Sequence, residues 1–420
     1  MATAAKKVVK EKQPAVVDLF SGQRAATTIS KTHTTELVIA LCGPIGSPLH
    51  EVASAVEDML VGQFDYEQCT KIRLSALIAE YAAKVKKEIP TRPGFEKIQA
   101  QIDVGNDLRE AYGASVLAEL AVNSIRLDRE KHKESTGSTS YAPRRVCHII
   151  DSIKNQEELD LLRMVYREML YVVGVFSPLE QREENLKRKG LDPAQVYQLI
   201  DRDSGEEAKT GQTVRDTFPQ CDFFLRMDSG SDSQLKRRVE RFLNLILGTK
   251  IITPTLNESA MYAAASAAAN SACLSRQVGA AVTTSDGEVI STGWNDVPRK
   301  DGGLYVYSPQ DPAGEADKRC WNREGGKCFN DEEKVLFADQ LMEALNKFIP
   351  AEKATEARTA IASFNKLRGL IEFSRSIHAE MHAILNAGKV DGSKIVGGKL
   401  FVTTYPSGEI ITPLPDPFFC

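Results

Sequence analysis

A histidine and a glutamate two positions apart are the residues of this chain best suited to do chemistry. They are His378 and Glu380, within the stretch SIHAEMHAIL at residues 376–385. A neutral imidazole is a common zinc ligand, and bound zinc lowers the pKa of a coordinated water towards neutrality. A carboxylate beside that water can take its proton and deliver it to a substrate. The pair therefore indicates metal-assisted hydrolysis, and it calls for further metal ligands elsewhere in the chain.

The elements that must position this pair are predicted from the pattern of the surrounding sequence. The alanine-rich segment 258–272 favours a helix. The segment 277–296 favours a hairpin around a Ser-Asp-Gly turn. Residues 298–370 begin with a stretch rich in glycine, proline and charge and continue with helical stretches, so we expect an insertion there. The strand KLFVTTYP, residues 399–406, follows the His-x-Glu helix.

Four stretches in this order resemble the cytidine and deoxycytidylate deaminase family. They are ANSACLSRQVGAAV (269–282), STGWND (291–296), HAEMHAIL (378–385) and TTYP (403–406). The resemblance implies that a zinc-bound water attacks a cytosine ring, with His378 as a zinc ligand and Glu380 as the proton shuttle. It also implies substrate-binding residues, namely Asn295 at the sugar, Thr403 and Tyr405 beside the base, and Arg276 near the site.

Some of these residues have a plainer interpretation. Arg276 and Thr403 could equally serve in packing or at the surface. His382 lies four positions after His378, on the same face of the helix. We expect His382 to support the site or the fold, with metal ligation as the alternative.

The second part of the zinc site is missing from its expected place. The family motif is Pro-Cys-x-x-Cys, which supplies two thiolates, but Ser407 and Ile410 stand at the cysteine positions in TTYPSGEIITPLPDPFFC. Prolines in this tail also disfavour the helix that would present the thiolates. We therefore interpret residues 407–420 as a truncation, an altered reading frame or a divergent end. Such a tail would leave a sheet edge exposed, and we expect deamination to be impaired.

Other cysteines are weaker candidates for ligands. Cys320 and Cys328 are separated by seven residues, which is not a standard zinc spacing. They could bind a second, structural metal or remain a reduced pair in a loop. Cys420 ends a proline-rich tail, and Cys273 is most simply a core residue.

The first 250 residues show a different pattern. Short apolar runs alternate with helical stretches, beginning with ELVIALCGPIGSPLHEVASAVEDML at residues 36–60. Further strand-like runs are RRVCHIID (144–151), YVVGVFS (171–177) and CDFFLRMD (221–228). The alternation predicts an open parallel α/β sheet. We therefore expect a flexible lead-in over 1–34, an α/β domain over 35–250 and a deaminase-like α/β/α domain over 251–406.

The turn after the first predicted strand lies where a phosphate-binding loop would be. The segment CGPIGSPLHEV, residues 42–52, offers Gly43, Gly46 and Ser47 for backbone contacts to phosphate. It lacks the lysine of a Gly-x4-Gly-Lys-Ser/Thr loop, so we expect nucleotide binding without phosphoryl transfer. Asp151, at the end of a predicted strand, could hold magnesium with that nucleotide, or it could cap a helix.

The N-terminal part also resembles nucleoside-monophosphate kinases. The stretches that carry this resemblance are QIDVGNDLREAYGASVLAELAV (101–122), IIDSIKNQEELDLLR (149–163) and QREENLKRKG (181–190). The resemblance implies a P-loop-like domain that senses a nucleotide effector or a partner. A kinase-like domain fused to a deaminase domain is also similar to bacterial anti-phage proteins that deaminate dCMP or dCTP. Deaminases of this family commonly assemble, which implies a homo-oligomer.

Composition limits the class of protein. The chain has 420 residues and a net charge of -4, which provides no basic field for nucleic acid. It contains no run of about 18 apolar residues, and its first residues lack the apolar segment of a signal peptide, so neither a membrane span nor secretion is expected. Eight cysteines in so long a chain do not indicate a disulfide scaffold, and a cytoplasmic location fits them better.

The function we expect is hydrolytic deamination of a deoxycytidine nucleotide, dCMP or dCTP, to dUMP or dUTP and ammonia. The missing thiolates favour one alternative, a catalytically inactive nucleotide-binding or regulatory protein. A second alternative, a nucleotide kinase, is disfavoured by the missing lysine. Editing of bases in nucleic acid is disfavoured by the acidic charge balance.

Overall fold

The chain consists of two compact units that divide between Ile252 and Thr253. The computed structural model describes residues 36–404, except 138–143, 204–213, 228–231, 312–313, 324, 346, 365–366, 368–369 and 371–372. Tyr405 and the tail over 407–420 lie outside the described residues, as does the predicted lead-in over 1–34. No described helix has the length and apolar character needed to cross a membrane. The two units are described separately below.

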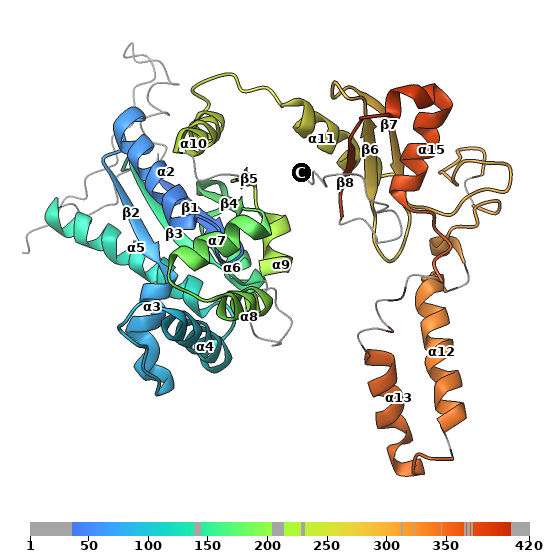
Figure 1. The fold of residues 1–420 in the computed structure, drawn as a ribbon, viewed down its shortest axis with the longest axis horizontal. Helices are drawn as coiled ribbons and strands as arrows, with labels where there is room; N and C mark the ends of the chain where they lie inside the picture. Colours follow the sequence, from blue (N-terminus) through green and yellow to red (C-terminus); the bar gives the residue numbers. More distant parts are fainter. Residues whose placement is uncertain are drawn as a thin grey trace, which may run out of the picture. The chain divides into compact units, whose positions relative to one another are not determined.

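The N-terminal unit is built on a five-stranded sheet in the order β2-β3-β1-β4-β5, and all of its neighbouring strands are parallel (Figure 1). The strands are β1 (Leu37–Cys42), β2 (Gln68–Arg73), β3 (Val146–Ile153), β4 (Leu170–Phe176) and β5 (Phe223–Arg226). Every residue of β1 is buried, because the strand is covered on both faces and its apolar sequence LVIALC suits both. The predicted parallel α/β sheet is thus confirmed.

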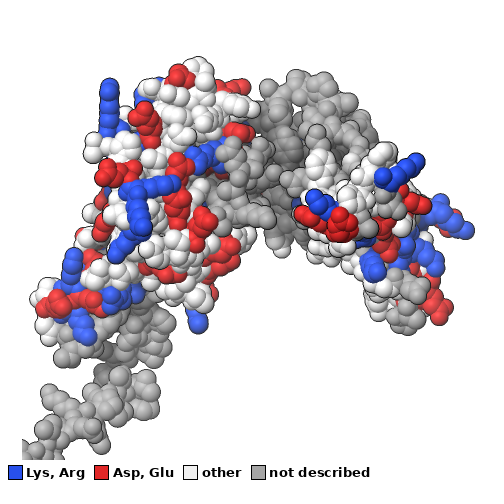
Figure 2. Space-filling view, turned by 90° about the horizontal axis from the view of Figure 1, so that it is seen from below, with Lys and Arg blue, Asp and Glu red and all other residues white. Residues whose placement is uncertain are grey.

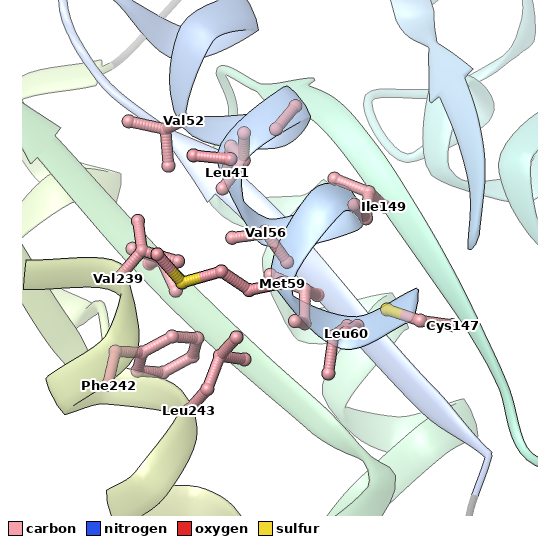
Figure 3. Close-up of a cluster of buried hydrophobic side chains, with 14 of the residues drawn as sticks. Leu41, Val52, Val56, Met59, Leu60, Cys147, Ile149, Val239, Phe242 and Leu243 are labelled. Carbon is pink, nitrogen blue, oxygen red and sulfur yellow. The ribbon is translucent and has the colours of Figure 1, made fainter. Parts of the chain in front are cut away.

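Helices cover both faces of this sheet. They are α2 (Leu49–Gln63), α3 (Leu74–Tyr81), α4 (Phe95–Tyr112), α5 (Val116–Ser135), α6 (Gln156–Tyr166), α7 (Leu179–Arg188), α8 (Pro193–Asp203), α9 (Val214–Thr217) and α10 (Asp232–Leu247). Alternate residues of β1 face opposite ways, so Ile39 and Leu41 pack with α2 and α10, while Val38 and Ala40 pack with α3, α5 and α6. Figure 3 shows the first of these cores, in which Met59 of α2 meets Phe242 of α10.

A smaller core forms away from the two faces of the sheet. The helices α7 and α8 bury Leu186, Val196 and Leu199 together with Ile102 of α4. Ile45, from the loop after β1, packs against this cluster. The loop that was predicted to approach phosphate is therefore held by α7 and α8.

The C-terminal unit is a three-stranded antiparallel sheet in the order β7-β6-β8, with one helix on each face (Figure 1). Its elements are α11 (Leu256–Ala268), β6 (Gly279–Thr283), β7 (Val289–Trp294), α12 (Phe329–Leu345), α13 (Ala354–Ser363), α15 (Ala379–Asp391) and β8 (Leu400–Val402). Thr255 and Glu258 form a capping box that fixes the start of α11. The predicted hairpin is present as β6 and β7.

Small residues allow the helices of this unit to lie close to the sheet. A Cβ atom on Gly279 would lie 1.9 Å from the carbonyl oxygen of Ala264 in α11. A Cβ atom on Gly293 would lie 2.3 Å from the backbone nitrogen of Ala383 in α15. Only glycine fits at these two positions, and the alanine faces of α11 and α15 complete the match.

Candidate active site

The predicted chemical pair lies at the start of α15. His378 is the N-cap residue, with extended backbone angles, and Glu380 falls in the first helical turn. Ile377 joins an isolated bridge with Asp296, in which its backbone N–H donates to the Asp296 carbonyl oxygen over 3.0 Å. The Glu380 side chain is almost wholly covered, at 1% exposure. A carboxylate in the first turn is favoured by the helix dipole, which partly offsets the cost of burying it.

His382 anchors α15 to the sheet. Its Nδ1 accepts a hydrogen bond from the backbone N–H of Trp294 over 3.2 Å, and the two rings meet edge to face. Burial lowers the pKa of His382, and the hydrogen bond from Trp294 forms only with an unprotonated Nδ1. The imidazole is therefore kept in the neutral form that can accept. These contacts match the supporting role expected for His382.

Asn295 holds the loop between α11 and β6. Its Oδ1 accepts from the backbone N–H of Val278 over 2.7 Å and from Ser271 Oγ over 3.0 Å. Its Nδ2 donates to the Arg276 carbonyl oxygen over 2.8 Å. The side-chain amide of Asn295, which was predicted to contact a sugar, thus stabilises this loop. Its Nδ2 carries a second N–H group that can donate to a ligand.

Thr403 and Arg276 come together at the end of β8. Thr403 Oγ1 accepts from the backbone N–H of Gly279 over 3.0 Å, which extends the pairing of β8 with β6. Arg276 is exposed and its Nη1 donates to Thr404 Oγ1 over 3.3 Å. The structure therefore brings Arg276, Asn295 and Thr403 to one loop cluster.

A buried ion pair beside this cluster was not predicted from the sequence. Asp296 is 1% exposed; its Oδ2 lies 3.5 Å from Nη1 of Arg319 and accepts from the backbone N–H of Ala272 over 2.9 Å. Arg319 also donates hydrogen bonds to the carboxylate of Asp317, its neighbour in the insertion. Burial alone would raise the pKa of Asp317, but these hydrogen bonds outweigh burial and lower it. The insertion is thus tied to the loop that carries Asn295. The STGWND motif includes Asp296, but no local signal marks an arginine 23 positions later in the chain.

The insertion also lines a polar cavity. The cavity has a volume of about 520 Å³ and is lined by Gly314, Glu315, Asp317, Lys318, Asn322, Arg323 and Arg375. Arg323 pairs with Glu332 over 2.9 Å. Lys318 and Arg375 form no ion pair with a carboxylate among the described residues; Arg375 Nη2 donates to the Lys318 carbonyl oxygen over 3.1 Å. Two cations without carboxylate partners among the described residues thus line this cavity, and one of them, Arg375, stands three positions before His378 in the sequence.

The residues present do not fit a zinc site of the expected kind. Within the described parts of the chain, no three His, Cys, Asp or Glu side chains gather as a metal site requires. Cys320 is buried and Cys328 is half-buried, and neither belongs to such a group. Ser407 and Ile410, which stand at the thiolate positions, lie outside the described residues, and neither side chain is a zinc ligand of the usual set.

The predicted nucleotide-binding residues of the N-terminal unit cluster at the carboxyl end of β1. Gly43 is packed so closely that a Cβ atom there would lie 2.4 Å from the Val175 carbonyl oxygen. Gly46 has a φ of +87°, a conformation that favours glycine. The Ser47 Oγ is buried and has no hydrogen-bond partner among the described residues. Asp151 is buried and its Oδ2 contacts Nδ1 of His50, which occupies the region of the missing lysine.

Surface charge is mixed on the face shown in Figure 2. Basic and acidic side chains alternate there over both units, in line with the small net charge of -4. Among the described residues visible on this face, no broad basic patch of the kind that binds a phosphate backbone is present.

Comparison with known proteins gave solved structures of low similarity and one matching family model. No curated protein matches the chain. A shikimate kinase from Bacteroides thetaiotaomicron is similar over 50% of this chain and 98% of its own, with 12% identity and a TM-score of 0.29. A gluconokinase from Sinorhizobium meliloti 1021 is similar over 52% and 100%, with 15% identity and a TM-score of 0.25. The Deinococcus radiodurans tunicamycin resistance protein is similar over 52% and 99%, with 14% identity and a TM-score of 0.28.

For the C-terminal unit, a family model supports the resemblance seen in the sequence motifs. Residues 254–409 match the model of the cytidine and deoxycytidylate deaminase zinc-binding region. This range contains α11, the β6–β7 hairpin, the insertion and α15 with His378 and Glu380. The C-terminal unit of this chain therefore carries a cytidine and deoxycytidylate deaminase region.

Proposed function

We propose that the C-terminal unit binds a deoxycytidine nucleotide, dCMP or dCTP, and that its reaction is hydrolytic deamination, strongly impaired in this chain. The observation that carries the proposal is the placement of Glu380, buried in the first turn of α15 directly after His378. A buried carboxylate at this point is suited to moving a proton between water, a ring nitrogen and a leaving amine. The incomplete donor set leaves the attacking water without activation, so turnover is expected to be low.

The polar cavity supports a phosphorylated substrate over a free nucleoside. Lys318 and Arg375 line it without carboxylate partners among the described residues, and an anion would compensate their charge. Glu315 and Asp317 also line the cavity, but Asp317 is already neutralised by Arg319 over 2.7 Å. Two cations suit a phosphate group, while a nucleoside alone offers them no charge.

Calorimetric titration of the full chain tests this assignment. We expect dCMP and dCTP to bind at least about tenfold more tightly than deoxycytidine, because hydrogen bonds between charged groups are worth about 1.5–3 kcal/mol. Arg375→Ala should remove most of that difference and leave the affinity for deoxycytidine unchanged. The matched control is Arg358→Ala, since Arg358 lies on α13 and pairs with Asp339. Equal affinity for nucleotide and nucleoside would refute the assignment of a phosphate subsite.

A second candidate function is nucleotide binding without catalysis, in a regulatory protein. Ser407 and Ile410 favour it, since they stand where the thiolates should be. The two functions share the binding step and differ in ammonia release. Zinc-dependent release from dCMP that disappears in Glu380→Gln would establish the enzyme, and binding without release would establish the regulator.

Depletion of deoxycytidine nucleotides in defence against phage is a role that only the active enzyme could fill. Assembly into a homo-oligomer and sensing of a nucleotide effector by the N-terminal unit belong to the same proposal. Light scattering of the purified chain, with and without dCMP, tests the assembly.

A further inference from the structure

The carboxylate of Asp203, a residue of α8, contacts the loop that follows β1. Its Oδ2 accepts from the backbone N–H of Ile45 over 2.5 Å, although the two residues are 158 positions apart. Its Oδ1 accepts from Lys154 Nζ over 3.0 Å. Asp203 is only 2% exposed, and the Lys154 side chain is 14% exposed. A buried anion is thus held by a loop amide and a lysine, the donor types that hold phosphate at such loops.

Side chains of α7 hold the same loop from another side. Arg182 Nε donates to the Ile45 carbonyl oxygen over 2.7 Å, and Asn185 Nδ2 donates to the Gly46 carbonyl oxygen over 2.9 Å. A Cβ atom on Gly46 would lie 2.7 Å from the Arg182 carbonyl oxygen, so loop and helix are in direct contact. Burial lowers the pKa of Arg182, and the negative charge of Asp203 partly counteracts this. Arg182 is thus a second cation, beside Lys154, that interacts electrostatically with the Asp203 carboxylate.

This cluster occupies the position where parallel sheets bind ligands. The strand β1 lies between β3 and β4 in the sheet. The chain leads from β1 to β2 on one side of β1 and from β3 to β4 on its other side, so the direction of the connections changes at β1. Ligands of such sheets bind at the carboxyl ends of the strands, at this change of direction. Lys154 follows β3 directly and reaches across to donate to the Gly43 carbonyl oxygen over 2.7 Å. Asp203 therefore stands where an external anion would be expected.

A further observation indicates that Asp203 is a substitute for a ligand. The Oγ atoms of Ser47, in the loop, and Ser177, directly after β4, are buried and have no hydrogen-bond partner among the described residues. Buried hydroxyl groups without partners are costly, which suggests a missing acceptor or donor at this edge of the sheet.

We propose that Asp203 is an internal occupant of an oxyanion site formed by the loop amide of Ile45 and by Lys154, and that the external ligand of this site is a phosphate group. The site takes inorganic phosphates or the phosphates of a nucleotide, and Asp203 keeps it closed in the chain as it stands. Lys154 supplies the charge that the loop itself lacks, from β3 rather than from the start of α2. The proposal concerns the N-terminal unit and does not depend on the deaminase assignment.

Binding of labelled pyrophosphate to the full chain tests the proposal by equilibrium dialysis. Asp203→Ala removes the internal anion, and we expect its affinity for pyrophosphate to exceed that of the wild type by about tenfold or more. Pyrophosphate should also raise the midpoint of thermal unfolding in this variant, because a ligand that binds only the folded chain stabilises it. Adding Lys154→Ala to the Asp203→Ala variant should abolish both the gain in affinity and the rise of the unfolding midpoint.

The matched control is Asp222→Ala. Asp222 also accepts from a backbone N–H, that of Val172 over 2.8 Å, and also pairs with a cation, Arg163 over 3.3 Å, but it lies away from the loop. This variant loses the same kinds of contact and should not gain affinity for pyrophosphate. If Asp203→Ala does not fold, Asp203→Asn removes the charge while keeping an acceptor for Ile45.

The outcomes separate clearly. Equal affinity of wild type and both Asp203 variants would overturn the proposal, since Asp203 would then not occupy the site. Loss of stability without any gain in pyrophosphate binding would also overturn it and would make Asp203 a structural clamp. If the gain is observed, competition by ATP assigns the site to nucleotides, and no competition assigns it to free phosphates.

Discussion

His382 in α15 and Trp294 in β7 are joined by a hydrogen bond from the Trp294 backbone N–H to His382 Nδ1, 3.2 Å long. Their ring centroids lie 4.8 Å apart in an edge-to-face arrangement. The contact fixes the helix that carries His378 and Glu380 to the hairpin that carries Asn295. It requires an unprotonated Nδ1, so it depends on pH.

Acid is expected to weaken the C-terminal unit through His382. Burial lowers the pKa of His382 in the folded chain, so as pH falls through the unfolded value of about 6.5 the unfolded chain binds more protons. The free energy of unfolding therefore decreases below that pH and is fully retained above it. Urea unfolding followed by tryptophan fluorescence measures this unit alone, because Trp294 and Trp321 are the only tryptophans.

The variant His382→Asn keeps an acceptor and does not titrate, so it should flatten this pH dependence. His132→Asn, on α5 in the other unit, is the control and should leave it unchanged. An unaltered pH profile in His382→Asn would show that another group is responsible.

Breaking the buried pair of Asp296 and Arg319 should destabilise the same unit. Arg319→Met leaves the 1% exposed Asp296 carboxylate without its cation, and such changes cost about 3–5 kcal/mol. Urea unfolding with tryptophan fluorescence measures the loss. Arg358→Met, which breaks the exposed pair with Asp339, should cause no measurable change. Equal stability of the two variants would mean that Asp296 finds other partners.

Gly293 is expected to be essential for the packing of α15. In Gly293→Ala the new Cβ atom would lie 2.3 Å from the Ala383 nitrogen and 2.6 Å from the Ala379 carbonyl oxygen. Overpacking of this kind costs about 1–3 kcal/mol. The control Gly388→Ala places a methyl group on α15 where nothing lies within 4 Å, and it should stabilise the helix by up to about 1 kcal/mol. If both alanines are tolerated alike, the helix is free to move away from the sheet.

The sequence predicted strands where burial on both faces leaves one continuous apolar run, as in β1. The sequence did not predict β2, which lies at an edge of the sheet. Its sequence, QCTKIR, mixes polar and apolar residues. Only Cys69 and Ile72 of this strand are buried, so its residues do not form an apolar run. The capping box at Thr255 and the Ser-Asp-Gly turn are local signals, and the helix and hairpin that they mark were predicted.

The candidate sites were predictable only in part, and for a physical reason. The spacing of His378 and Glu380 is local, so the start of α15 could be found from the sequence. Arg319 and Asp203 act on residues far along the chain, and only the fold brings them there. Side-chain pairs of this kind leave no pattern within one segment, so a single sequence does not reveal them.

The central claim is that this deaminase region lacks a complete zinc donor set. Elemental analysis of the purified chain after incubation with zinc and dialysis, beside His378→Ala and Glu380→Ala, tests it most directly. The account predicts far less than one equivalent of retained zinc per chain, in the wild type and in both variants alike, and only slow release of ammonia from dCMP or dCTP. One equivalent of zinc that is lost in His378→Ala and kept in Glu380→Ala would contradict it, because the site would then complete itself from other residues.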